Sequence, residues 1–302
     1  MPNWGQVLAE IQADESKLAH KSKSAIDNVR RKYLRRLNKH TGRNVIGYYS
    51  GWLTNPRAPG IDVNDEDKAA FMMAIHGLDK SKGLDLILHT PGGGIAAAES
   101  LVDYLRRVFG TDIRAIVPHL AMSAGTMIAC SCKSIVMGKQ SNLGPIDPQL
   151  NGLPAAAVTK EIERAIREIK ESPERLQFWQ FVLNKYSPTF VGQCEQAIKM
   201  AAEFVRARLL DNMLIGIDGA EGVAEAIVSG LSDVEENKSH ARHIHIDKCQ
   251  DLGLKIECLE DDQDLQEAVL TVHHCYMHSL GVSGASKMVE NHQGAAFVKI
   301  PT

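Results

Sequence analysis

The stretch 87-ILHTPGGGI-95 decides how this chain folds, together with 121-AMSAGTM-127 further along. Each is a short apolar run that ends at glycines or at small residues. A strand that ends in three glycines leaves backbone N–H groups without side-chain cover, and the start of the next helix adds positive potential there. Such a turn can hold an anion, either a phosphate or the oxyanion of acyl transfer, or it can simply let a strand and a helix pack closely.

The same alternation of apolar runs and helical patterns continues on both sides of these stretches. Strands that are apolar nearly throughout indicate a parallel sheet covered by helices on both faces, so the predicted class is α/β. The expected strands are 44–52, 84–90, 112–120 and 133–138, and the expected helices are 62–78, 94–109 and 123–131.

The composition is that of a globular protein. The 302 residues are 44 % hydrophobic and 24 % charged, with a net charge of −3. This charge gives no overall attraction to nucleic acid or to an anionic membrane, and the basic run at 30–39 is interpreted as a solvated helix face. The sequence has neither an apolar run long enough to span a membrane nor a secretory signal, and its six cysteines form no disulfide pattern, so a reduced, cytoplasmic protein is expected.

Three parts are expected along the chain. Residues 1–42 form an N-terminal helical arm, with a helix over 3–40 that ends at Thr41-Gly42. Residues 43–150 and 240–285 form the α/β core, with a helix and strand at 246–260 and a last helix at 261–280. Between them, 151–239 has helical patterns punctuated by prolines and is predicted to be a helical subdomain. The tail to Thr302 gives little signal.

Ser123 stands where the next strand passes into a short helix. A serine there commonly caps the helix, which stabilises it by about 1 kcal/mol. The carboxyl ends of parallel strands lie on one edge of a sheet, however, so Ser123 and the glycine turn are expected to meet. A serine nucleophile beside backbone donors is half of an acyl-transfer site. The phosphate-binding glycine motifs do not match this sequence.

Longer motifs around these stretches resemble a known family. They are HTPGGG (89–94), AMSAGTMIA (121–129) and MGKQSNLGPIDPQ (137–149), with HHCYMHSLGV and ENHQGAAFV towards the tail. They resemble the ClpP/crotonase superfamily of serine peptidases, its SppA-like (S49-type) branch and, within that, the serine dehydrogenase proteinase family. The resemblance implies a ClpP/crotonase-like spiral core of ββα units, hydrolysis of peptide bonds without a cofactor, and a homo-oligomer.

The resemblance also assigns roles to residues. Ser123 matches the nucleophile. Gly93, with Gly92 beside it, matches the glycine that donates to the oxyanion, and Ala124 would supply the second N–H.

The general base is left open between several residues. ClpP uses a histidine about 25 residues after its serine, but the corresponding stretch here has only Asp147, which could orient a base or form a turn. SppA-like enzymes use a lysine, which must be desolvated to lose its proton. Lys160 is the favoured candidate for a Ser-Lys dyad. The other candidates are Lys133, Lys139, His119 and His89.

The remaining histidines, at 243, 245, 273, 274 and 278, do not form a recognisable zinc motif, and no metal site is predicted. The expected substrates are small or unfolded polypeptides. Because no P-loop is present, unfolding would need a separate ATPase partner. Two alternatives remain: crotonase-like chemistry on a thioester, and a non-catalytic scaffold that binds partners.

Overall fold

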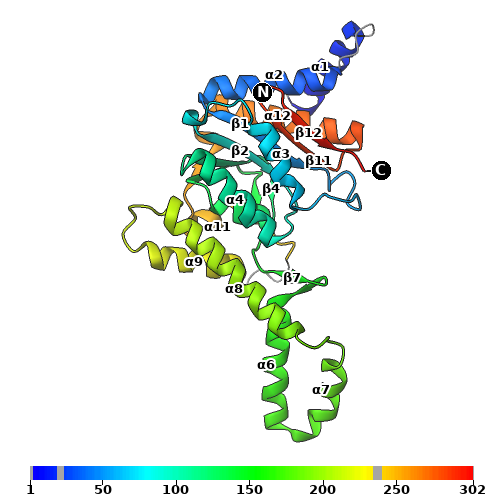
Figure 1. The fold of residues 1–302 in the computed structure, drawn as a ribbon, viewed down its shortest axis with the longest axis vertical. Coiled ribbons are helices and arrows are strands. Elements are labelled where there is room, and N and C mark those ends of the chain that lie inside the picture. The colour runs from blue at the N-terminus through cyan, green and yellow to red at the C-terminus, as the bar shows by residue number, and fades with distance from the viewer. Residues whose placement is uncertain (1–2, 19–23, 234–239, 302) are drawn as a thin grey trace.

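A mixed seven-stranded sheet forms the centre of the computed structural model, which describes residues 3–18, 24–233 and 240–301 (Figure 1). The strand order is β10-β5-β3-β2-β1-β11-β12. The first five of these run parallel, whereas β11 is antiparallel to both β1 and β12. The strands are β1 (Asn44–Ser50), β2 (Leu84–His89), β3 (Ile113–Val117), β5 (Ser134–Met137), β10 (Ile256–Cys258), β11 (Lys287–Asn291) and β12 (Ala296–Lys299).

Helices cover both faces of this sheet. One face packs Leu86 and Leu88 against α3, α4 and α5, and the other packs Val45 and Ile87 against α2 and α12. Every residue of β1 and β2 is buried, as expected for strands covered on both sides. The α/β class is therefore confirmed. The covering helices are α2 (Ala25–Thr41), α3 (Glu66–Ile75), α4 (Ile95–Phe109), α5 (Ala124–Cys130) and α12 (Gln263–Ser283).

Short strands beside the carboxyl edge make two further sheets. One has the order β4-β6-β9 and the other pairs β7 with β8. Strand β3 of the large sheet is followed by β4 of the small sheet and then by α5, which makes a ββα unit. The short strands are β4 (Leu120–Ala121), β6 (Asn142–Leu143), β7 (Gln149–Leu150), β8 (Leu153–Pro154) and β9 (Ile244–His245).

The predicted helical region contains two differently packed parts. Helices α6 (Ala155–Glu171) and α7 (Leu176–Leu183) extend away from the sheet as an arm, and α8 (Phe190–Arg208) runs from this arm back to the body (Figure 1). The second half of α8 and α9 (Ala220–Ser232) join the same hydrophobic cluster as the sheet. The proposed division into three parts stays a prediction.

Two segments differ from expectation. The single helix expected over 3–40 is α1 (Trp4–Leu18) followed by α2, and residues 19–23 of that expected helix lie outside the described residues. The tail, which gave little signal, supplies β11 and β12. The expected helix and strand at 246–260 are α11 (Ile246–Asp251) and β10.

Among the helices described here, none is both long and apolar enough to cross a bilayer.

Candidate active site

The glycine turn after β2 is shaped by close contact with two other segments. Gly92 has a φ of +97° and Gly93 a φ of +153°, which side chains disfavour. A Cβ on Gly92 would lie 2.5 Å from the Cβ of Ser123, and one on Gly93 would lie 2.4 Å from the backbone of Val63. The chain has glycine at both positions because Ser123 and Val63 already occupy that space.

Ser123 is held in a strained backbone conformation beside this turn. Thr90 pairs with Ala121 in a parallel bridge, which places the residues after β4 next to the glycines. Ser123 has φ 51° and ψ −116°, and its side chain makes no capping hydrogen bond to α5. The helix-cap interpretation is therefore wrong. A non-glycine residue at positive φ costs about 1–3 kcal/mol, and residues strained in this way are enriched at functional sites.

Two backbone N–H groups remain open next to Ser123. Val63 N–H donates to Gly92 O (2.7 Å), and Gly94 N–H donates to Val63 O (2.9 Å). In such a parallel bridge the N–H of the middle residue, Gly93, points away from Val63. Within the described residues, neither the Gly93 N–H nor the Ala124 N–H has an acceptor. Ala124 N lies 3.0 Å from the Cβ position of Gly92, so both donors lie close to Ser123.

A histidine and an aspartate face each other near the same place. His240 Nδ1 lies 2.9 Å from Asp147 Oδ1, and Asp147 is only 5 % exposed. The Thr126 hydroxyl donates to Ala121 O (2.8 Å) and accepts from Gly144 N–H (2.9 Å), which ties the start of α5 to the segment that carries Asp147. A carboxylate at Nδ1 orients an imidazole and leaves its Nε2 free to take a proton.

One cavity brings these groups together. It has a volume of about 780 Å³ and is lined by Ser123, the glycine turn and His240, with Asp62–Asp65 and 148–150 on its walls. Asp147 contacts His240 but does not itself line the cavity. The sequence does not indicate that His240 belongs to the site, because this histidine follows Ser123 by more than a hundred residues and belongs to no motif. Only the folded chain places it here.

The predicted lysine bases lie elsewhere. Of the described residues, no lysine lines the cavity. Lys160 is exposed in the second turn of α6, and Lys139 is exposed after β5, where its backbone N–H donates to Glu260. Lys133 pairs with Asp112 at the opposite, amino edge of the strands.

The two strand-end histidines lie on the other face of the sheet. The His89 ring lies 5.6 Å from His119 and 5.2 Å from His273, between Tyr49 and Trp52. Burial lowers the pKa of both His89 and His119, so both are neutral at pH 7. Neither lines the Ser123 cavity.

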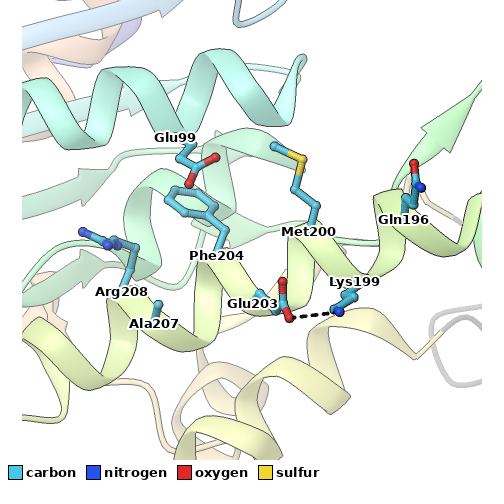
Figure 2. A pocket seen from close by; sticks show the side chains of 8 residues that line it. All are labelled: Glu99, Gln196, Lys199, Met200, Glu203, Phe204, Ala207 and Arg208. Atoms are coloured by element: carbon cyan, nitrogen blue, oxygen red, sulfur yellow. Dashed lines mark ion pairs between the residues drawn. The ribbon is translucent and has the colours of Figure 1, made fainter. Parts of the chain in front are cut away.

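A second hollow has a different set of groups. A hollow of about 400 Å³ lies between α4 and α8, with the Lys199–Glu203 ion pair on its rim (Figure 2). It contains carboxylates, Met200 and Phe204, but no nucleophile beside a base. Over the described residues, no three His, Cys, Asp or Glu side chains are arranged to hold a metal ion.

The chain matches the model of ClpP-like SDH-type serine proteinases over residues 17–287 and belongs to that family. The predicted family and the ClpP/crotonase-like fold are thereby confirmed. Ser123, which matches the nucleophile in the resemblance, lines the cavity described above.

Two relatives come from the archaeon Methanocaldococcus jannaschii. Uncharacterized protein MJ0137 is 29 % identical over 211 residues, which is 70 % of this chain and 64 % of the relative. Uncharacterized protein MJ1495 is 30 % identical over 191 residues, 63 % of this chain and 58 % of the relative. The match thus spans about three-fifths of the length of each relative.

Proposed function

We propose that this protein is a serine peptidase whose nucleophile is Ser123 and whose base is His240, oriented by Asp147. The observation that carries this proposal is the Asp147–His240 contact on the cavity that Ser123 lines. The strained serine without a capping bond and the two open N–H groups support it independently. This assignment replaces the Ser-Lys dyad with Lys160, because that lysine does not line the cavity.

In the proposed reaction, Ser123 Oγ attacks the peptide carbonyl while His240 Nε2 takes the hydroxyl proton. The Gly93 and Ala124 N–H groups donate to the oxyanion that forms. His240 then gives its proton to the leaving amine, and the acyl group remains on Ser123. A water molecule, deprotonated by His240, releases the acyl group and restores the serine.

Hydrolysis of an unbiased peptide mixture, read by mass spectrometry, tests this function. Wild-type cleavage should fall by at least about 10³-fold in Ser123→Ala and in His240→Ala. Lys160→Met and Lys139→Met, matched controls outside the cavity, should keep wild-type rates. A loss in Lys160→Met with full activity in His240→Ala would restore the Ser-Lys dyad.

Other results would assign other functions. Binding of coenzyme A in calorimetry, without peptide cleavage, would favour crotonase-like thioester chemistry. Cellular effects that survive in Ser123→Ala would favour a scaffold.

The proposed substrates are small or unfolded polypeptides, because a cavity of about 780 Å³ accepts a short peptide segment and not a folded domain. Folded substrates would then need a separate ATPase. Degradation of a tightly folded protein by the chain alone would contradict this.

Self-association is also proposed. Family membership supports it, and so do Phe178 and Phe181 of the arm, which are 60 % and 68 % exposed. A monomeric mass in light scattering at micromolar concentration would contradict it.

A further inference from the structure

A lysine in strand β11 is buried against the loop that supports the glycine turn. The Lys287 side chain is only 2 % exposed and pairs with Asp67, which is 1 % exposed, at 2.5 Å. Replacing such a buried ion pair by uncharged groups is often neutral or stabilising, because burial removes both charges from water. Stability alone therefore does not account for a lysine at this place.

The contacts of the pair converge on the loop 61–64. Lys287 Nζ donates to Asp62 O at 2.7 Å, and the other oxygen of Asp67 accepts from Asn64 N–H at 2.9 Å. Tyr48 OH donates to that same oxygen at 2.8 Å and so fixes the carboxylate. The two bonds from the pair hold the residues on either side of Val63.

A neighbouring serine adds a third attachment. Ser50, which stands opposite Lys287 in the β1–β11 register, donates from its hydroxyl to Ile61 O at 2.7 Å. The loop is thus fixed at three points, residues 61, 62 and 64, by side chains of the sheet and of α3.

Val63 links the loop 61–64 to Gly93, whose N–H is the proposed oxyanion donor. Its backbone bonds to Gly92 O and Gly94 N–H enclose Gly93, and no Cβ would fit between Gly93 and Val63. A shift of the loop therefore moves the Gly93 N–H. An error of about 1 Å in such a group can cost about 10²-fold in rate.

We propose that Lys287, together with Asp67, is a positioning residue that fixes the oxyanion-binding turn through the loop 61–64. This inference rests on the proposed peptidase function for its effect on catalysis. Lys287 touches neither the substrate nor the reacting atoms. Its effect is on kcat, because the oxyanion exists only in the transition state.

The test uses the full chain with Lys287→Met alone and with the double variant Lys287→Met/Asp67→Asn. The single change leaves the Asp67 carboxylate buried without its cation, and it is expected to lower stability. The double variant removes both charges, and an asparagine oxygen can still accept from Tyr48 and Asn64. It should therefore melt within a few degrees of the wild type. Its kcat on a fluorogenic peptide should fall by about 10- to 100-fold, with KM changed less than about threefold.

The matched control is Lys299→Met. Lys299 lies on the next strand, β12, and pairs with Glu66 at the surface, without a bond to the loop 61–64. It should keep wild-type kcat and KM. Wild-type kcat in a folded double variant would overturn the inference, and so would a fall in kcat of the same size in Lys299→Met.

Amide hydrogen exchange separates this inference from the proposed function. Exchange across 91–96 should be at least about tenfold faster in the double variant than in the wild type, whether or not any peptide is cleaved. If exchange is faster in the double variant but the wild type cleaves no peptide, the positioning role of Lys287 is supported and the proposed peptidase function is refuted. Unchanged exchange would overturn the positioning role.

Discussion

At the residue scale, the site depends on the absence of a side chain at Gly92. A methyl group there would meet the Ser123 Cβ at 2.5 Å and the Met122 carbonyl oxygen at 2.7 Å, and alanine would also be strained at a φ of +97°. Gly92→Ala should therefore displace Ser123. We expect labelling of Ser123 by a fluorophosphonate probe to slow by at least about 10²-fold, because the nucleophile and its donors lose their alignment.

The neighbouring glycine provides the control for this change. Gly94 has a φ of −67°, and the nearest atom to a Cβ there lies at 3.6 Å, an ordinary contact. Gly94→Ala should keep a labelling rate within about threefold of the wild type. Equal labelling of all three proteins would mean that the Gly92–Ser123 contact does not set the reactivity of the serine.

The residues of the candidate site were predictable from the sequence where they belong to short local motifs. Gly92 and Gly93 are adjacent in one motif, Ser123 and Ala124 are adjacent in a second, and apolar runs signal the strand ends that carry both motifs. His240 could not be found in this way, since its position depends on how the helical region returns the chain to the carboxyl edge. The sequence predicts that Asp147 could orient a base, but it does not identify which residue that base is.

At the scale of elements, the buried strands that consist of apolar residues were predicted from the sequence, whereas a buried strand that contains charged residues was not. Strands β1, β2, β3 and β5 were predicted because their residues are almost all apolar. Strand β11 reads KMVEN and is nonetheless buried throughout, since Lys287 and Glu290 each have a charged partner. Such pairing is a property of the folded chain, and the sequence of β11 alone does not reveal it.

Helix α12 gives a prediction about acid stability. Burial lowers the pKa of His273 to about 3, with His119 adding to the effect. Its unfolded value is near 6.5, so below that pH the unfolded state binds a proton that the folded state excludes. The free energy of unfolding should fall as the pH falls, by roughly 1.5 kcal/mol between pH 6.5 and pH 5 from this residue.

His273→Phe, measured by urea unfolding at both pH values, should lose that part of the pH dependence. The Phe ring can occupy the same space against Tyr49, which lies 5.8 Å from the His273 ring, and His89. The exposed His76→Gln serves as control and should follow the wild type. A pH dependence unchanged in His273→Phe would show that His273 does not exclude the proton.

At the scale of the whole molecule, a buried ion pair joins helix α2, early in the chain, to strand β11, more than 250 residues later. Arg30 of α2 and Glu290 of β11 contact at 2.5 Å with side chains 2 % and 1 % exposed. Arg30 also donates to Ser279 of α12 at 2.7 Å, and Arg31 reaches the second Glu290 oxygen at 2.6 Å. The helical layer on this face of the sheet is thereby tied to the last strands of the chain.

Glu290→Gln should destabilise the protein by about 3 kcal/mol, because it removes the buried carboxylate partner of Arg30 and leaves only the partly exposed Asp27, at 2.8 Å, to pair with that charge. The shift of the urea midpoint measures this cost. The exposed pair Arg107–Asp103 supplies the control, and Asp103→Asn should cost less than about 1 kcal/mol, since water solvates both charges in either state. Equal small costs for the two variants would mean that the Arg30–Glu290 contact is solvated in solution and contributes little to holding α2 against β11.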